Sequence, residues 1–306
     1  MKKRSFVLFG HPVRHSISAH MFKAAFRDAG LPHIYSPVDV GSTDALRRAV
    51  GYVRDGIYDG ANITLPYKRD VLQFADELDP SAERVGAANV IVSSAKGRIT
   101  AHNTDESALH SIIGSATAGR SRAAILGSGG AAFAAISACR RLAFSVVGVT
   151  TRSWVDTDTM ITAKRADRVR RLGALTSVWP SHERSPPSTK LSMAMRLQWT
   201  ELAQLADIVI QATSAGTAGL DPGDEVASFV PFPHMSKKTI ALDLVYNPAQ
   251  TPFLKKAEDA GITAINGLSM LVRQAEASYA LWVGEPPPAG SMQCAAEMAM
   301  QEQSPA

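Results

Sequence analysis

Two series of short apolar runs, each alternating with helical patterns, constrain the fold of this chain more than any other feature. In the first series the apolar runs cover residues 6–9, 34–40 and 61–64, and the helical patterns cover residues 19–29 and 44–53. Such alternation is typical of βαβ units, in which each helix carries the chain back across a sheet. The pattern therefore predicts an α/β fold with a mostly parallel sheet.

The second series predicts another α/β unit further along the chain. Its apolar runs cover residues 122–126, 145–151, 207–212 and 239–243, and an alanine-rich helical pattern covers residues 130–142. A helical pattern from Asp105 to Ile113 lies between the two series and is long enough to bridge them, so we expect an interdomain cleft near residues 103–106. Two further helical patterns, at 268–282 and about 292–301, are expected to return to the first domain.

The composition is that of an ordinary globular chain. The 306 residues are 45% hydrophobic and 20% charged, which suffices for two domains that each bury a core. A net charge of only +4, from 32 basic and 28 acidic residues, gives little support to nucleic-acid binding. We interpret the densest basic run, Lys164 to Arg171, as the solvated face of a helix. Residues 155–198 show no strong strand period, and Ser185 to Thr189 predicts a loop.

The cysteines and histidines indicate neither a disulfide framework nor a metal site. Cys139 and Cys294 are the only cysteines, and their wide separation favours a reducing cytoplasm. His11, His15 and His20 crowd one segment but lack partners at a metal-site spacing. No segment approaches the length of a membrane span. We therefore expect a cytoplasmic protein that holds no metal and binds no membrane.

A glycine-rich turn follows the apolar run at 122–126 and opens the alanine-rich helix. It reads Gly127-Ser128-Gly129-Gly130-Ala131. In this context glycines let backbone amides approach a pyrophosphate, and the helix N-terminus adds the positive end of its dipole. The turn therefore predicts a dinucleotide site, with a tight turn that binds no ligand as the alternative.

The residues after the next strand indicate which dinucleotide binds. An enzyme that uses NAD normally places Asp or Glu there against the ribose 2′-hydroxyl, whereas this chain has Thr151-Arg152-Ser153. A guanidinium pairs with a 2′-phosphate through bidentate, charge-assisted bonds. We therefore expect NADP as the cofactor, with NAD as a weaker alternative. The competing interpretation is that Arg152 is a surface arginine that binds no cofactor.

A lysine and an aspartate are the candidates for proton transfer. Lys68 ends the polar stretch Gly60 to Lys68, in which Pro66 suits the first turn of a helix. The positive end of that helix would disfavour the charged ammonium and so ease the loss of its proton. Asp105 follows a predicted strand at 98–101 and could hold Lys68 through a charge-assisted hydrogen bond. The alternatives are a solvated lysine and a helix N-cap within Asn103-Thr104-Asp105.

The chain resembles the shikimate dehydrogenase family over nearly its whole length. The matching motifs are Gly10 to Ser18, Gly60 to Lys68, Ala88-Asn89, Asn103 to Asp105, Gly127 to Gly130, Ala212 to Ser214, Asp243 to Tyr246, Thr251 to Leu254 and Asn266 to Gln274. The resemblance implies a two-domain α/β fold with a cleft. Residues 1–105 and 271–306 would bind substrate and carry catalysis, and residues 106–270 would form a Rossmann-like NADP-binding domain.

The resemblance also implies an activity, the reversible reduction of 3-dehydroshikimate to shikimate with NADPH on the route to chorismate and the aromatic amino acids. It assigns catalysis to Lys68 and Asp105. It places Ser16, Ser18, Asn62, Thr64, Asn89, Tyr246 and Gln274 on the ring acid, and Gly127, Ser128, Gly129, Gly130, Ala131, Thr151, Arg152, Thr213, Leu244 and Gly267 along the cofactor. Structural alternatives stay open: Ser18 as a helix cap, Asn62 or Asn89 as loop ties, and Gly267 as a backbone turn.

Several positions depart from what the resemblance implies. The family usually has proline where this chain has Ala19, and glycine where this chain has Glu106 and Ser269. It often has arginine where this chain has Asp156. These departures keep open the alternative of a paralogue that acts on quinate or a modified shikimate. A catalytically silent NADP-binding protein is a separate alternative, and the retention of both Lys68 and Asp105 argues against it. Quinate-using branches of the family often carry threonine where this chain has Ser18, which favours shikimate. We expect a monomer or homodimer.

Overall fold

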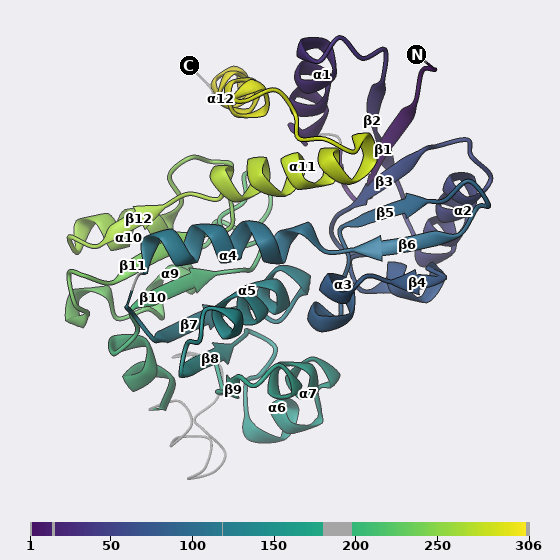
Figure 1. Ribbon diagram of the computed structural model, residues 1–306. Coiled ribbons are helices and arrows are strands. Elements are labelled where there is room, and N and C mark those ends of the chain that lie inside the picture. Colours follow the sequence, from purple (N-terminus) through teal and green to yellow (C-terminus); the bar gives the residue numbers. More distant parts are fainter. Residues whose placement is uncertain (1, 14–15, 118, 180–197, 304–306) are drawn as a thin grey trace. The chain divides into compact units, whose positions relative to one another are not determined.

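The computed structural model describes residues 2–13, 16–117, 119–179 and 198–303. The chain divides into two compact units, one of Met1–Ala108 with Ser269–Ala306 and the other of Leu109–Leu268 (Figure 1). Each unit has its own six-stranded sheet, so the predicted α/β fold with two units is confirmed.

The first unit contains a mixed sheet in the order β2-β1-β3-β5-β6-β4. The strands are β1 Ser5–Gly10, β2 Ile34–Asp39, β3 Gly60–Ile63, β4 Glu77–Leu78, β5 Val90–Ser93 and β6 Ile99–His102. As expected, β1 pairs in parallel with β2 and β3. The prediction of a mostly parallel sheet does not extend to β5, which runs antiparallel to both β3 and β6. A short turn between β5 and β6 explains the antiparallel pairing of these two strands, because only a longer crossover could join parallel neighbours.

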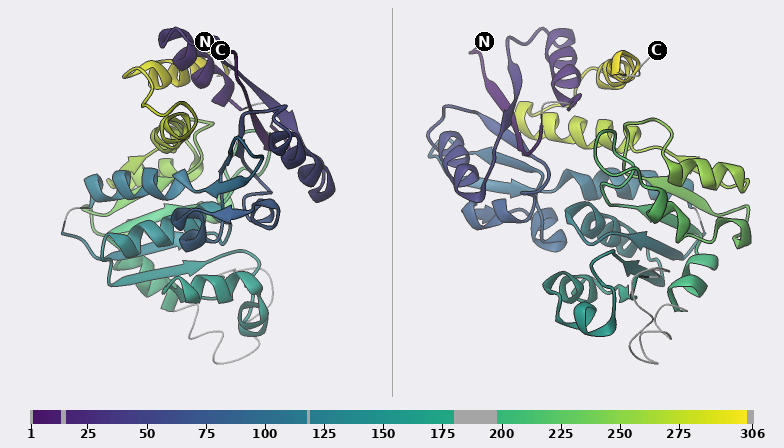
Figure 2. Two further views of the ribbon diagram at one scale, coloured as in Figure 1. Left: turned by 45° about the vertical axis from the view of Figure 1, so that its right-hand side comes forward. Right: turned by 180° about the vertical axis from the view of Figure 1, so that it is seen from behind.

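Helices cover both faces of this sheet. They are α1 Ser18–Asp28, α2 Thr43–Arg54, η1 Asp70–Phe74, α3 Pro80–Val85 and α11 Leu268–Val283. Helix α12, Ser291–Gln303, packs against α1 (Figure 2). On one face Val7 and Phe9 of β1 pack with Leu46 and Val50 of α2.

The opposite side chains of β1 enter an aromatic cluster on the other face. Phe6 stacks on Trp282 of α11 with ring centroids 4.6 Å apart, and Phe26 of α1 lies against both Phe6 and Tyr279. Because side chains alternate along a strand, β1 contributes alternate residues to the cores on the two faces of the sheet. The cluster joins the first strand of the chain to a helix near its other end.

The second unit contains a fully parallel sheet in the order β12-β11-β10-β7-β8-β9. Its elements are β7 Arg122–Leu126, α5 Gly130–Arg141, β8 Val146–Thr150, α6 Thr157–Thr162, α7 Lys164–Arg171, β9 Leu175–Thr176, β10 Ile208–Gln211, α9 Asp224–Ser228, η2 Phe232–His234, β11 Ile240–Asp243, α10 Pro252–Asp259 and β12 Thr263–Ile265. Four of the five residues of β7 are fully buried. A central parallel strand is covered on both faces, which explains its unbroken apolar run.

Other predictions about segments have mixed outcomes. The basic run Lys164 to Arg171 forms α7 and buries only Ala166 and Val169, which confirms a largely solvated helix. The loop predicted at Ser185 to Thr189 lies outside the described residues. Within the described part of the chain, no helix combines the length and apolarity needed to cross a bilayer.

Candidate active site

The helix that carries Asp105 is capped by its neighbour. Helix α4, Thr104–Ala116, follows β6 directly, and Asn103 Oδ1 accepts a hydrogen bond from the backbone N–H of Glu106 at 2.9 Å. Asn103 Nδ2 donates to the carbonyl oxygen of Ala87 at 2.8 Å, which fixes the cap in place. The N-cap alternative is therefore confirmed for Asn103. The carboxylate of Asp105 is left for another partner.

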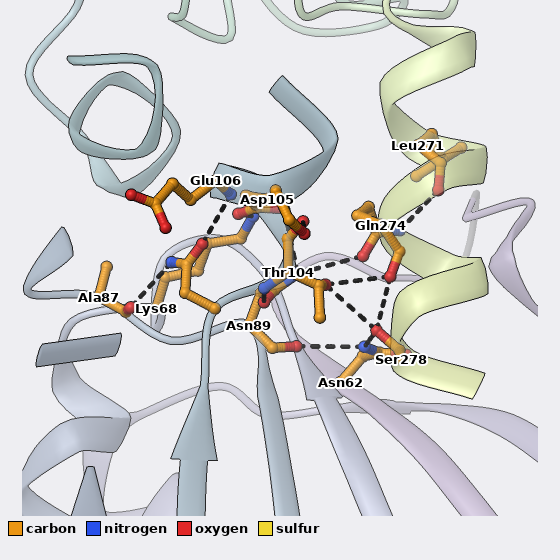
Figure 3. A network of polar contacts seen from close by, with 12 residues as sticks. Asn62, Lys68, Ala87, Asn89, Thr104, Asp105, Glu106, Leu271, Gln274 and Ser278 are labelled. Atoms are coloured by element: carbon orange, nitrogen blue, oxygen red, sulfur yellow. Dashed lines mark hydrogen bonds and ion pairs between the residues drawn. The ribbon is translucent and has the colours of Figure 1, made fainter. Parts of the chain in front are cut away.

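That partner is Lys68. Its Nζ donates to Asp105 Oδ2 at 2.5 Å, and only 2% of the aspartate side chain and 20% of the lysine side chain are exposed (Figure 3). A buried carboxylate is stable in its charged form only when it is paired and hydrogen-bonded. The structure thus brings together the two residues chosen for proton transfer, and the alternative of a solvated lysine is wrong.

The local structure around Lys68 differs from the prediction. Lys68 lies in a turn at residues 65–69, and the helix that follows, η1, is a short 3₁₀ helix that starts at Asp70. The N–H of Tyr67 bonds back to the carbonyl of Thr64 at 3.0 Å, so the strand ends in a turn and Pro66 does not open an α-helix. The expected influence of an α-helix dipole on Lys68 was wrong. The ion pair with Asp105 is what fixes the ammonium.

Asn89 holds the other oxygen of Asp105. Its Nδ2 lies 3.0 Å from Asp105 Oδ1, 2.8 Å from Thr104 Oγ1 and 3.1 Å from Gln274 Oε1, and its Oδ1 accepts from the N–H of Thr104 at 2.7 Å. The two amide hydrogens thus serve three acceptors. Asn89 is 2% exposed, so the structure supports a role in orienting Asp105.

Asn62 is fully engaged inside the protein. Its Nδ2 donates to the Asn89 carbonyl at 3.1 Å and to Ser278 Oγ at 2.9 Å, and its Oδ1 accepts from the Tyr35 hydroxyl at 2.9 Å. No amide hydrogen remains for a ligand. The structure therefore favours the loop-tie alternative for Asn62 over contact with substrate. Sequence reasoning missed Ser278, although it lies four residues after Gln274 on α11 and hence on the same helix face.

Ser16 and Ser18, the two serines expected to bind the carboxylate of the substrate, lie beside each other. Ser16 Oγ donates to Ser18 Oγ at 3.0 Å and accepts from the Ser18 N–H at 3.3 Å. Ser18 is the first residue of α1 and Ile17 occupies the N-cap position, so the alternative of Ser18 as a helix cap is wrong. Thr64 follows β3 and is half-buried, as is Gln274, whose Nε2 donates to the Leu271 carbonyl at 2.8 Å.

Glu106 does not alter the site in the way its position beside Asp105 suggests. Its side chain is 1% exposed and accepts two bonds from Arg84 near the C-terminus of α3, at 2.9 and 2.8 Å. A bidentate pair of this kind compensates a buried charge. Glu106 thus ties α4 to α3, and sequence reasoning missed Arg84 because nothing local links positions 22 residues apart.

The glycine turn of the second unit has the geometry of an anion site. Gly127 has φ +120°, and a Cβ there would lie 2.8 Å from the carbonyl oxygen of Ala212, so only glycine fits. Gly129 is the N-cap of α5 and provides no side-chain cap, while the Ser128 hydroxyl is buried without a partner among the described residues. The first N–H groups of α5, at Gly130 and Ala131, have no side-chain acceptor among the described residues. These features fit a bound phosphate group.

The arginine expected to select NADP lies in a turn after β8. Arg152 follows Thr151 and forms an ion pair with Asp221, a residue that sequence reasoning missed. Asp156 has another use: its Oδ1 accepts from the N–H of Thr159 at 2.8 Å and caps α6. The carboxylate at position 156 is therefore committed to a helix end.

The remaining cofactor candidates lie at the ends of β10, β11 and β12. Thr213 Oγ1 accepts from the N–H of Ala215 at 3.1 Å. A Cβ at Gly267 would lie 2.5 Å from the carbonyl oxygen of Leu244, so close backbone approach requires glycine and supports the structural alternative. Tyr246 follows β11 in this unit and is half-buried. Contacts of these residues with ligands stay predictions.

A buried carboxyl precedes Leu244. Asp243 is completely buried, accepts from Thr251 Oγ1 at 2.6 Å and from the Val245 N–H at 2.9 Å, and burial raises its pKa from 3.8 to about 7. Between these values the folded state retains a proton that the unfolded state has lost, so stability falls as pH rises from about 4 to 7 and then levels off.

We expect Asp243→Asn to remove this pH dependence. The unfolding free energy of the parent relative to the variant should fall by about 2–4 kcal/mol between pH 4 and pH 8. Urea unfolding of both proteins across this range measures the difference, since other titrating groups are common to the two. Parallel stability curves would show that Asp243 keeps an ordinary pKa.

Known proteins resemble this chain in sequence over most of its length. The family described as "Shikimate dehydrogenase substrate binding domain" matches residues 8–91, and that described as "Shikimate 5'-dehydrogenase C-terminal domain" matches residues 267–297. The shikimate dehydrogenase (NADP(+)) of Methanopyrus kandleri is 33% identical over 92% of this chain and 90% of its own length. This chain belongs to the shikimate dehydrogenase family. The resemblance to this family that the sequence motifs indicated is thereby confirmed.

Solved structures extend the comparison. Shikimate 5-dehydrogenase from Thermus thermophilus, in complex with NADP(H) and shikimate, has a TM-score of 0.77 and 29% identity, covering 97% of this chain and 99% of that one. The 5-ketofructose reductase of a Gluconobacter species has a TM-score of 0.73 and 26% identity over 97% of this chain and 99% of its own. The same architecture therefore occurs in a dehydrogenase named for shikimate and in a reductase named for 5-ketofructose.

Proposed function

We propose that this chain catalyses the reversible reduction of 3-dehydroshikimate to shikimate with NADPH, a step toward chorismate and the aromatic amino acids. The observation that carries the proposal is the 2.5 Å pair of Lys68 Nζ and Asp105 Oδ2, held by Asn89 in a nearly buried network. Membership of the family supports the choice of substrate. The relative from Methanopyrus kandleri is named for shikimate and NADP(+).

The proton is managed by the chain's own residues. NADPH, when bound, supplies the hydride that reaches the carbonyl carbon of the substrate. Lys68 Nζ donates the proton that the former carbonyl oxygen then needs, and in the reverse direction it accepts the hydroxyl proton. Asp105 Oδ2 orients the ammonium through its hydrogen bond. Asn89 keeps the carboxylate from rotating away, because it holds Oδ1 at 3.0 Å.

We assign the ring acid to the first unit. Ser16 and Ser18 suit its carboxylate because hydroxyl groups donate to carboxylate oxygens, and Thr64 and Gln274 suit its ring hydroxyls. Tyr246 belongs to the second unit and is proposed as a further substrate contact. The proposed substrate and catalytic domain comprises residues 1–105 and 271–306, and the proposed dinucleotide-binding domain comprises residues 106–270.

We assign NADP to the second unit. Support comes from the uncapped start of α5 and the unpartnered Ser128 hydroxyl in the described structure, both suited to the pyrophosphate. Arg152 beside Thr151 would bind the 2′-phosphate, and Thr213, Leu244 and Gly267 would line the rest of the cofactor. A cytoplasmic location and a monomeric or dimeric state stay predictions.

An activity assay tests the proposal. The purified chain is incubated with NADP and either shikimate or quinate, and the rise in NADPH absorbance is followed. 5-Ketofructose, the ketone for which one structural relative is named, is incubated in parallel with NADPH, and the loss of NADPH absorbance is followed. We expect turnover of shikimate that requires both the ring acid and the cofactor. Turnover of another compound alone would assign the chain to a paralogue, and no turnover of any would support the catalytically silent alternative.

A further inference from the structure

Arg152 is already occupied by a carboxylate in this structure. Its guanidinium Nη1 donates to Asp221 Oδ2, and Asp221 is the side-chain partner that the described residues provide for it. The arginine side chain is 39% exposed and the aspartate side chain 29% exposed. Both groups thus remain accessible to a ligand.

The backbone holds Asp221 in this position. Asp221 Oδ1 accepts from the N–H of Gly223 at 2.9 Å, and its carbonyl oxygen accepts from the N–H of Gly216 at 2.8 Å. The loop is anchored again where the N–H of Ala218 donates to the carbonyl of Asn247 at 3.0 Å. Backbone hydrogen bonds of the loop therefore hold the Asp221 carboxylate in place.

The strand order gives this ion pair its importance. Asp221 lies on the loop after β10 and Arg152 on the turn after β8, and β7 lies between these two strands in the sheet. The pair therefore links loops on both sides of the carboxyl end of β7, where the Gly127 turn begins. Ligands of parallel α/β sheets bind at this edge.

The charge at this point opposes a phosphate. The Gly223 N–H and the Arg152 guanidinium lower the pKa of Asp221, so its carboxylate is charged at neutral pH. A 2′-phosphate bound by Arg152 would have to share the guanidinium with this anion or displace it, whereas a 2′-hydroxyl carries no charge for the carboxylate to repel.

We propose that Asp221 is a specificity-determining residue that competes with the 2′-phosphate for Arg152 and so weakens the preference of this chain for NADP over NAD. The inference rests on the proposed cofactor site. It assigns Asp221 an effect on NADP that is absent for NAD, because only NADP brings the competing charge.

The test measures binding by calorimetry rather than turnover. Asp221→Asn removes the charge and retains an oxygen that can accept from Gly223. We expect it to tighten NADP binding about fivefold, equivalent to about 1 kcal/mol, and to change NAD binding less than twofold. The same contrast should hold for 2′,5′-ADP against 5′-AMP, and it should shrink at high salt because the residues are partly exposed.

Two further variants separate the inference from the cofactor site on which it rests. Asp224→Asn is the matched control, since Asp224 is exposed on the same segment and its removal changes the net charge equally. Arg152→Ala should weaken NADP at least tenfold and leave NAD nearly unchanged. In the Arg152→Ala background, Asp221→Asn should then have a smaller effect on NADP, because only the direct repulsion between the carboxylate and the phosphate remains.

The outcomes are distinct. Equal losses of NADP and NAD in Arg152→Ala would overturn the proposed cofactor site itself. A selective loss there, combined with unchanged or weaker NADP binding in Asp221→Asn, would overturn only the competition by Asp221. An Asp224→Asn variant that matches Asp221→Asn would reduce the effect to overall charge and also overturn the inference.

Discussion

Lys68→Ala is expected to fold and to bind NADP as the parent does, yet to lose about 10²–10⁴-fold in kcat, because a positioned proton donor supplies acceleration of that size. The 2.5 Å contact of Lys68 Nζ with Asp105 Oδ2 gives the physical reason. Without the ammonium, the substrate oxygen has no donor from this pair. Steady-state kinetics with shikimate, together with calorimetric binding of NADP, measure the two effects separately.

Two companion variants complete this experiment. Lys96→Ala removes an exposed lysine from the turn between β5 and β6 and should leave turnover unchanged. Asp105→Asn keeps the shape of the side chain but removes the charge that holds Lys68, and it should also be severely impaired. A Lys68→Ala enzyme within about threefold of the parent would contradict the assignment, since the expected factor is far larger.

Shikimate should be preferred to quinate by about ten- to hundredfold in kcat/KM. Quinate has an additional hydroxyl on the carbon that bears its carboxylate, and its saturated ring is puckered. Ser16 and Ser18 already bond to each other at 3.0 Å, and Ser18 is 6% exposed. A polar group that enters such a site without a partner costs about 1–3 kcal/mol, which gives the predicted ratio.

Measuring kcat/KM for both acids at saturating NADP checks this preference. The Lys96→Ala protein again acts as a control, because an exposed change on the first unit should leave the ratio as it is in the parent. Equal values, or a higher value for quinate, would place the chain with the paralogues and remove the two serines as the basis of selection.

The sequence predicted best where local chemistry is sufficient. The strand Arg122–Leu126 and the helix from Gly130 follow from a buried apolar run and glycines, and both have the expected bounds at their junction. The Lys68–Asp105 pair was predicted because a carboxylate can hold a lysine through a charge-assisted hydrogen bond, and because the family resemblance implies the same two residues. The helix expected at Lys68 failed, since a proline after a strand also fits a turn.

Contacts between distant positions were not predictable in the same way. Arg84 and Glu106, or Arg152 and Asp221, form pairs that depend on how separate elements pack, and one sequence contains no periodic signal for them. The role of Ser278 also requires the packing of α11 against β3, because Asn62 is its partner. The four-residue spacing between Gln274 and Ser278 indicates only that both lie on the same face of the helix.

The aromatic stack of Phe6 on Trp282 has a consequence for the order of events during synthesis. The ribosome delivers β1 before residues 109–268, but the helix that covers β1 arrives only after that segment has emerged. That middle segment is continuous in sequence and can fold as it leaves the ribosome, as N-terminal domains do. Gln274 and Ser278, which bond Asn89 and Asn62, also come from the late helix. The polar network around Asp105 is therefore completed only after residues 109–268 have been synthesised, and a nascent chain halted at residue 268 would lack it.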